Sequence, residues 1–181
     1  MDARLAPVTI GVLGSGTDAH ETLGRGLGEL LAELGVNLLT GGGAGVMTTV
    51  ARAFTSSRRT RGISIGIVPC RSARDRARPP DGYPNAFVEL PIYTHLPFSG
   101  ARGTDDLSRN HINVLSSTAL VALPGAEGTA SEIALAVTYR KPMIAYGWND
   151  ASAETLPADI PRAATLDEVR TFLRAHAGAV A

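Results

Sequence analysis

Short apolar runs alternate with segments of helical hydrophobic spacing, and this alternation limits the possible folds more than any other feature of the sequence. The apolar runs predict strands at residues 8–13, 36–39, 63–68, 87–93, 119–123 and 142–146. The segments between and after them predict helices at residues 20–34, 46–54, 105–116, 129–139 and 165–176. Strands that alternate with helices pair in parallel through right-handed crossovers. The sequence therefore predicts an α/β fold with a doubly wound parallel sheet.

The length and composition favour one soluble globular domain, which we expect to span residues 1–181. Hydrophobic residues make up 44% of the chain and charged residues 19%, and the formal net charge is +0. A neutral chain has no overall electrostatic attraction to nucleic acid or to an anionic membrane, so neither is a predicted partner. No run of 18 apolar residues is present to cross a membrane.

The cellular location is predicted from the cysteine content and the first residues. Cys70 is the only cysteine, so the fold depends on no internal disulfide. Residues 1–7 contain Asp2 and Arg4 and do not resemble a signal peptide. We therefore expect a cytoplasmic protein.

Three glycine-rich turns follow predicted strands and lead toward predicted helices. They are Gly14-Ser15-Gly16, the TGGGAG run at residues 40–45 and the PGAEGT run at residues 124–129. In an open parallel sheet, ligands bind at the carboxyl ends of the strands, where free helix amides attract anions. One such turn is weak support, because tight turns use glycine for steric reasons alone. Three at one edge of one sheet predict a phosphate-bearing small molecule, such as a nucleoside monophosphate.

Several ligand and enzyme classes are disfavoured by missing residues. Residues 36–43 hold no acid to bind the ribose of NAD, and no phosphate-binding GxxxxGK[ST] loop is present. No His, Cys and Asp pattern has metal-ligand spacing, and Ser15 lacks the context of a serine hydrolase nucleophile. The only lysine, Lys141, precedes a predicted strand at the wrong edge for a pyridoxal-phosphate enzyme. We therefore predict no metal and no resident cofactor.

The segment 108–146, SRNHINVLSSTALVALPGAEGTASEIALAVTYRKPMIAY, resembles the LOG superfamily, whose members are often mislabelled as lysine decarboxylases. The matching features are Arg109, the PGAEGT motif that starts 15 residues later, and Glu132. The TGGGAGVM run at residues 40–47 is similar to the family's second glycine loop. The pair Arg109-Asn110 resembles the branch that includes molybdenum-cofactor carrier proteins.

The resemblance implies a Rossmann-like fold, a homodimer and hydrolysis of the N-glycosidic bond of a nucleoside 5′-monophosphate. Arg109 and Glu132 would be the catalytic residues, with Glu132 stabilising positive charge on the ribose ring and Arg109 holding the phosphate or the leaving base. The residues expected to bind the phosphate or nucleotide are Gly14, Ser15, Gly16, Thr40, Gly41, Gly42, Gly43, Gly45, Val46, Met47, Asn110, Pro124, Gly125, Ala126, Glu127, Gly128 and Thr129.

Other interpretations of the same residues stay open. Ala126 replaces a motif glycine, and Glu127 adds negative charge near an anion site, so a carrier that binds a nucleotide or molybdopterin without chemistry is the alternative function. Arg109 could instead pair with Asp105 or Asp106, and Glu132 could act only in capping. The arginine-rich segment 70–85 is predicted to be a surface loop that lies over the binding crevice.

Overall fold

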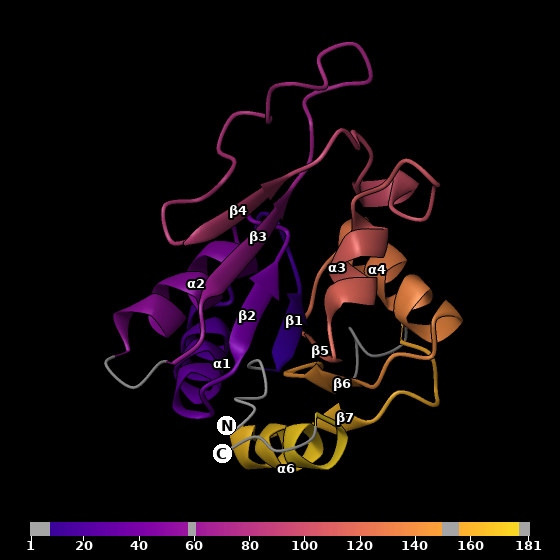
Figure 1. Cartoon of the computed structure of the whole chain (residues 1–181). Coiled ribbons are helices and arrows are strands. Elements are labelled where there is room, and N and C mark those ends of the chain that lie inside the picture. The colour runs from indigo at the N-terminus through magenta and orange to yellow at the C-terminus, as the bar shows by residue number, and fades with distance from the viewer. Residues whose placement is uncertain (1–7, 58–60, 150–155, 178–181) are drawn as a thin grey trace, which may run out of the picture.

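A computed structural model describes residues 8–57, 61–149 and 156–177 of the chain, and they contain one parallel β-sheet (Figure 1). Seven strands form this sheet in the order β4-β3-β2-β1-β5-β6-β7. Their bounds are β1 Thr9–Leu13, β2 Asn37–Thr40, β3 Ser64–Val68, β4 Leu90–Tyr93, β5 Ala119–Ala122, β6 Met143–Tyr146 and β7 Arg162–Ala163. Every neighbouring pair is parallel, as the sequence predicts. The order reverses between β1 and β5, where a doubly wound sheet places its ligand.

Helices cover both faces of the sheet (Figure 1). Their bounds are α1 Glu21–Glu33, α2 Val46–Ser56, α3 Asn110–Ser116, α4 Glu127–Thr138 and α6 Leu166–His176, with a short 3-10 helix at Gly100–Arg102. Side chains of α1, α2 and α6 form one hydrophobic core with the sheet, and those of α3 and α4 form a second. Both cores contain side chains from the same central strands, β1, β5 and β6. The α/β doubly wound prediction is therefore confirmed.

The central strands are apolar on both faces because both faces are covered. In β1, Ile10 and Val12 join the core under α1 and α2, whereas Leu13 joins the core under α3 and α4. In β5, Val121 joins the core under α1 and α2, whereas Leu120 joins the core under α3 and α4. This alternation explains why these strands appear in the sequence as continuous apolar runs.

Some predicted boundaries differ from the structure for local reasons. β4 begins at Leu90, three residues after the predicted start, and the two-residue strand β7 was not predicted. α3 begins at Asn110 and not at residue 105, because residues 103–107 form turns and a bend, and Asp105 there pairs with Arg102 at 2.7 Å. Arg109 therefore lies at the N-cap of α3. α4 begins two residues early, which places Glu127 in its first turn.

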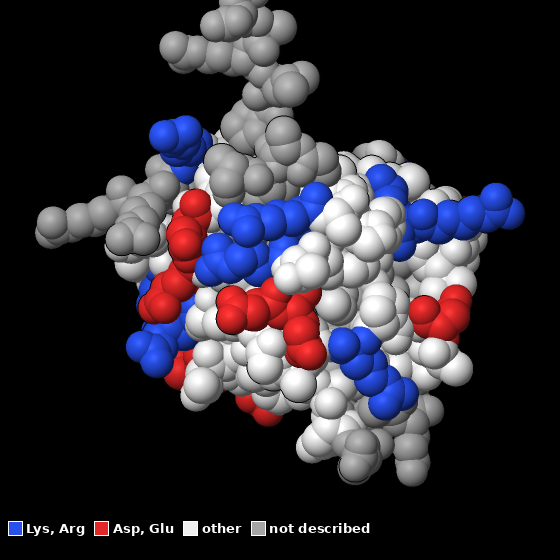
Figure 2. All heavy atoms as spheres, turned by 90° about the horizontal axis from the view of Figure 1, so that it is seen from below, with Lys and Arg blue, Asp and Glu red and all other residues white. Residues whose placement is uncertain are grey.

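The face at the opposite edge from the carboxyl ends of the strands has mixed charge. Figure 2 shows this face from below, with positive and negative side chains next to each other over its described part. On α6, Arg170 pairs with Glu33 of α1 at 3.1 Å and with Asp167 at 3.8 Å. This arrangement agrees with the absence of net charge in the sequence.

The predicted capping box at the start of α6 is present, and its removal tests the helix. The Glu168 amide donates to the Thr165 hydroxyl at 3.3 Å, and the Thr165 amide donates to the Glu168 carboxylate at 2.9 Å. We expect Thr165→Ala to lower the free energy of unfolding by about 1 kcal/mol, because the cap satisfies amides that have no partner within the helix. Urea unfolding measures this change.

Thr171→Ala is the matched control, because Thr171 lies on the same helix and its hydroxyl only donates to the Asp167 carbonyl. Its effect should stay within about 0.5 kcal/mol. Equal losses in the two variants would contradict a specific capping role for Thr165.

Candidate functional site

A cleft of about 250 Å³ opens at the carboxyl ends of the strands, and all three glycine-rich turns reach it. It is lined by Val12, Gly14, Ser15, Gly16, Thr17, Gly41, Met47, Tyr83, Ser99, Gly100, Arg109, Asn110, Ala126, Gly128, Thr129 and Glu132. The segments that follow β1, β2 and β5 therefore meet at one place, as predicted from their positions at one edge of the sheet.

Ser15 connects the three turns through its backbone and side chain. Its amide donates to the Pro124 carbonyl at 3.3 Å, and its carbonyl accepts from the Val46 amide at 2.9 Å. Its hydroxyl accepts from the amides of Thr17 and Asp18 at 3.2 and 2.8 Å. The structure therefore assigns Ser15 a role in holding the turns together.

The second glycine turn uses two of its amides in bonds within the turn and to α2. The Gly42 amide donates to the Thr40 hydroxyl at 3.1 Å, and the Gly43 amide donates to the Met47 sulfur at 3.4 Å. Gly45 has a φ of 63°, and an added Cβ there would lie 2.3 Å from the Ser15 carbonyl. Of the predicted residues in this run, only Gly41 and Met47 line the cleft.

Several residues predicted to bind the ligand lie outside the cleft lining. Thr40, Gly42, Gly43, Gly45 and Val46 lie behind the cleft lining, where hydrogen bonds and close packing shape the turn. The amides of Gly42, Gly43 and Val46 are therefore not free to converge on an anion, because the protein already uses them.

The third glycine-rich turn positions the first helical turn of α4 so that Gly128 and Thr129 line the cleft. The first hydrogen bond in the helix runs from the Ala130 amide to the Ala126 carbonyl at 3.0 Å. The amides of Gly128 and Thr129 have no acceptor within the described part of the chain, as expected for the first turn of a helix. Ala126 has a φ of −101°, so alanine in place of the motif glycine causes no backbone strain. This end of α4 can bind an anion. Pro124, Gly125 and Glu127 adjoin the cleft without lining it.

Arg109 lines the cleft with a buried guanidinium. The residue is 5% exposed, and its Nε and Nη1 have no hydrogen-bond partner among the described residues. The guanidinium packs on the bare Cα of Gly41, where an added Cβ would lie 1.9 Å from Nη1. The alternative ion pair with Asp105 is not formed, because Asp105 pairs with Arg102.

Unpaired polar atoms are concentrated at this cleft. Five buried side-chain atoms in the described ranges have no partner, and three of them belong to cleft residues, namely Arg109 Nε, Arg109 Nη1 and Thr129 Oγ1. Native proteins leave few such groups, because each costs free energy when it is removed from water. Three of the five at one cleft make it the strongest candidate site for a polar ligand in the described ranges.

Glu132 supplies the acidic group of the cleft. It is 8% exposed, and its Oε1 accepts from Asn113 Nδ2 at 2.8 Å. Burial raises the pKa of the Glu132 carboxyl above its ordinary value of 4.5, while Arg109 and the Asn113 hydrogen bond act in the opposite direction. Asn113 was not predicted, although it lies one helical turn after Arg109 and orients Glu132.

The other cleft residues come from the start of α3 and from loops whose conformation the sequence pattern does not specify. Asn110 lines the cleft as predicted, and its Nδ2 donates to the Ser131 hydroxyl at 3.1 Å. Tyr83, Ser99 and Gly100 were not predicted as site residues. Tyr83 belongs to segment 70–85, which confirms that part of this loop lies over the crevice, while Arg71 pairs with Asp81 at 3.7 Å outside it.

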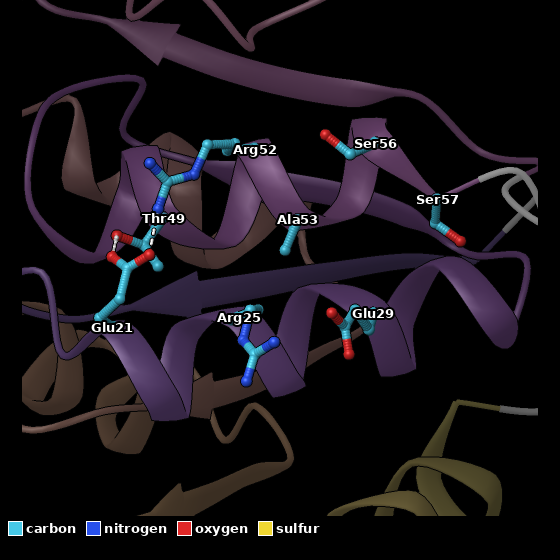
Figure 3. Close-up of a pocket in the computed structure, with 8 residues that line it drawn as sticks. All are labelled: Glu21, Arg25, Glu29, Thr49, Arg52, Ala53, Ser56 and Ser57. Carbon is cyan, nitrogen blue, oxygen red and sulfur yellow. Dashed lines mark hydrogen bonds and ion pairs between the residues drawn. The ribbon is translucent and has the colours of Figure 1, made fainter.

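A larger hollow of about 400 Å³ lies between α1 and α2 (Figure 3). Glu21 is paired there with Arg52 and accepts from the Thr49 hydroxyl at 3.2 Å. No loop from a strand end contributes to it. Its charged groups satisfy one another in part, so the strand-end cleft is the stronger candidate site.

Lys141 lies where the sequence predicted, before β6 and away from the cleft. Its ammonium donates to the carbonyls of Leu115 and Ser117 at 2.8 and 2.7 Å. Within the described ranges, no three His, Cys, Asp or Glu side chains are placed to hold a metal ion. None of the helices described is long and apolar enough to span a bilayer.

Comparison with known proteins identifies the family. The family model described as the SLOG cluster4 family matches residues 7–172. The chain belongs to the SLOG cluster4 family. This assignment and the structural neighbours confirm the predicted membership of the LOG superfamily, near the molybdenum-cofactor carrier branch.

Solved structures similar to this SLOG cluster4 chain include two molybdenum-cofactor proteins. The molybdenum cofactor binding protein of Rippkaea orientalis is 27% identical with a TM-score of 0.70, over 96% of this chain and 98% of that one. The Moco carrier protein of Chlamydomonas reinhardtii is 28% identical with a TM-score of 0.68, over 92% and 98%. An uncharacterised protein of Archaeoglobus fulgidus is 35% identical over 130 residues, which are 71% of this chain and 72% of that protein.

Proposed function

We propose that the cleft binds a phosphate-bearing small molecule of the nucleotide or molybdopterin class. The observation that carries this proposal is the buried Arg109, whose Nε and Nη1 have no partner and which lines the same cleft as the start of α4. Buried guanidinium N–H groups without a hydrogen-bond partner are costly, and an anionic ligand that accepts from them removes that cost. The planar guanidinium matches a phosphate with two parallel hydrogen bonds.

The start of α4 completes the proposed phosphate site. The Gly128 and Thr129 amides and the unpaired Thr129 hydroxyl provide further donors, and the positive end of the helix dipole favours an anion there. The cleft therefore combines one cation with backbone and hydroxyl donors. Such a set binds phosphate without a metal ion.

A carrier role is the first form of this proposal. The similar solved proteins are described as binding or carrying the molybdenum cofactor, which would be cargo here, held and released unchanged. Ala126 and the pair Arg109-Asn110 agree with this role. The homodimer and the cytoplasmic location expected from the sequence stay predictions.

Native mass spectrometry of the purified protein tests binding directly. We expect a small phosphorylated anion to co-purify, and its mass after denaturing release should be unchanged by prolonged incubation with the protein. Calorimetric titration of ligand-free protein with AMP, GMP, CMP, UMP and inorganic phosphate is the second test. A protein that co-purifies with no anion and binds none of these probes would sink the proposal.

A second candidate is hydrolysis of a nucleoside 5′-monophosphate, and Glu132 is the observation that favours it. Glu132 lines the same cleft as Arg109 and interacts with it electrostatically, and these are the two residues to which the LOG resemblance gives the catalytic role. Water would form a bond to ribose C1′ while the bond to the base nitrogen breaks, and the base would leave with a proton. The Glu132 carboxylate would stabilise the positive charge on the ribose ring. Chromatography of free base and ribose 5-phosphate distinguishes this activity from carriage.

The acidic side chain beside the proposed phosphate site provides a graded test. Glu127 is exposed in the first turn of α4, and its charge opposes an incoming phosphate. We expect Glu127→Gln to tighten the binding of the best nucleotide probe by about two- to fivefold at low salt, with a smaller gain at high salt. Titration at two salt concentrations measures this. Asp167→Asn on α6 is the control, because Asp167 is exposed at the opposite edge, and an equal gain in both variants would contradict a local effect.

A further inference from the structure

Tyr83 is the one aromatic side chain that lines the cleft. It lies in segment 70–85, far in sequence from the glycine turns, and its phenol ring packs over Gly43. A Cβ added at Gly43 would lie 2.6 Å from the Tyr83 hydroxyl and 2.7 Å from Cζ. The hydroxyl has no hydrogen-bond partner among the described residues, and the residue is only half-buried. Tyr83 therefore keeps part of its surface accessible where it lines the cleft.

Asn85 holds the Tyr83 segment on the second glycine turn. Its amide donates to the Gly42 carbonyl at 2.8 Å, and its side-chain Nδ2 donates to the Gly43 carbonyl, also at 2.8 Å. Its Oδ1 accepts from the Phe87 amide at 3.0 Å. These three bonds fix the backbone two residues after Tyr83 on the second glycine turn, and Tyr83 lines the cleft beside it.

The cleft lining combines two kinds of chemistry. Arg109 and Thr129 provide the charged and polar donors, whereas Tyr83 provides a flat apolar face. A nucleotide has the same division, with an anionic phosphate at one end and a flat heterocycle at the other. Stacking of a base on an aromatic ring tolerates different bases and contributes substantially to affinity.

We propose that Tyr83 recognises the heterocycle of the ligand by stacking, and that Asn85 is the positioning residue that holds Tyr83 in place. This proposal rests on the proposed function, because it takes the phosphate to bind at Arg109 and α4. It predicts a ligand class, namely phosphorylated molecules with a flat heterocycle, over sugar phosphates of equal charge. The juxtaposition that carries it is the unpaired Tyr83 ring over Gly43, in the same cleft as the unpaired Arg109 guanidinium.

The experiment compares AMP with ribose 5-phosphate, which keeps the charge and the sugar but lacks the base. Calorimetric titration of the full chain measures both affinities for wild type, Tyr83→Ala, Tyr83→Phe and Asn85→Ala. We expect Tyr83→Ala to weaken AMP binding by roughly 10- to 100-fold while ribose 5-phosphate changes by less than about twofold. Tyr83→Phe keeps the ring and should stay within about threefold of wild type for both probes.

Asn85→Ala should reduce the preference for AMP over ribose 5-phosphate in the same direction as Tyr83→Ala, but less, because the Asn85 backbone bond to Gly42 is kept. Tyr93→Ala is the matched control, since Tyr93 lies on β4, is 61% exposed and does not line the cleft. Thermal unfolding confirms that each variant is folded before titration.

The possible failures are distinguishable. Equal loss of both probes in Tyr83→Ala, or an unchanged ratio, would overturn the stacking role while the phosphate site stands. A loss in Tyr83→Phe as large as in Tyr83→Ala would also overturn it, since the hydroxyl and not the ring would then make the contact. If wild type binds neither AMP nor ribose 5-phosphate, the role of Tyr83 in recognising a nucleotide base fails, whereas the proposed function fails only if no anion co-purifies with the protein and none of the other probes binds.

Discussion

Replacement of Arg109 by glutamine is expected to weaken binding of the best nucleotide probe on the order of 100-fold. Arg109 is the one basic side chain in the cleft lining, and its Nε and Nη1 have no partner in the described chain. A phosphate bound there would lose a bidentate, buried ion pair, which is worth far more than an exposed one. Calorimetric titration measures the loss.

Gly41→Ala tests the same interaction without removing the charge. An added Cβ at Gly41 would lie 1.9 Å from Arg109 Nη1 and 2.5 Å from Cζ, so the guanidinium must move out of its place. We expect a loss of affinity comparable to that of Arg109→Gln. Arg174→Gln is the control, because Arg174 is exposed in the last turn of α6, far from the strand-end cleft.

Protein stability separates a binding role for Arg109 from a structural one. Because Nε and Nη1 are buried without a hydrogen-bond partner, Arg109→Gln mainly loses the attraction to the Glu132 carboxylate and should lower the melting temperature of ligand-free protein only slightly. Retained affinity in Arg109→Gln, or a large fall in melting temperature with no change in affinity, would contradict the site. The phosphate would then bind elsewhere or not at all.

Glu132→Gln is expected to reduce N-glycosidic hydrolysis by roughly 100- to 10,000-fold if the protein is a hydrolase, with nucleotide affinity within a few-fold of wild type. Glutamine has the same shape and keeps an oxygen to accept from Asn113 Nδ2. It cannot supply the negative charge that stabilises the ribose cation. Release of free base, measured by chromatography under saturating substrate, provides the readout. A variant as active as wild type would exclude Glu132 from the chemistry.

The pH dependence of activity follows from the same carboxyl. Burial raises the pKa of Glu132 above 4.5, and only the ionised carboxylate stabilises a cation. The rate should therefore fall as pH decreases through this raised pKa, so the acid limb lies above pH 4.5. An acid limb at or below pH 4.5 would contradict the role of a buried carboxylate.

Glu132→Gln is expected to stabilise the folded protein, whereas removal of a carboxyl whose pKa is lowered by folding destabilises it. Because the pKa is higher in the folded than in the unfolded state, the folded protein keeps its proton in the pH window just above 4.5 while the unfolded chain releases it. The free energy of unfolding of wild type therefore decreases as pH rises through that window. Relative to wild type, Glu132→Gln should be more stable at pH 8, and this difference should shrink toward pH 4. Urea unfolding at the two pH values measures it.

The alternation of apolar runs with helical periodicity was sufficient to predict the parallel sheet, because both patterns depend on neighbours close in sequence. Val12, Val121 and Leu38 are buried on the sheet, as their runs indicated. The PGAEGT motif likewise places the start of α4 at a strand end, and the motif resemblance selected Arg109 and Glu132. The start of α3 was predicted five residues early. The residues around Asp105 and Asp106 fit a helical pattern, but in the structure Asp105 pairs with Arg102 in a turn before the helix.

The sequence by itself determined the fold class, the edge of the sheet that faces the cleft and the two charged residues within it. The tertiary structure alone decided which backbone amides are free. The Gly43 amide donates to the Met47 sulfur, whereas the Gly128 and Thr129 amides have no acceptor in the described chain. The tertiary structure also packs Tyr83 against Gly43 and forms the hydrogen bond from Asn113 to Glu132. The reason is physical: periodicity and turn chemistry act over a few residues, whereas hydrogen bonding and burial depend on atoms that only the folded chain brings together.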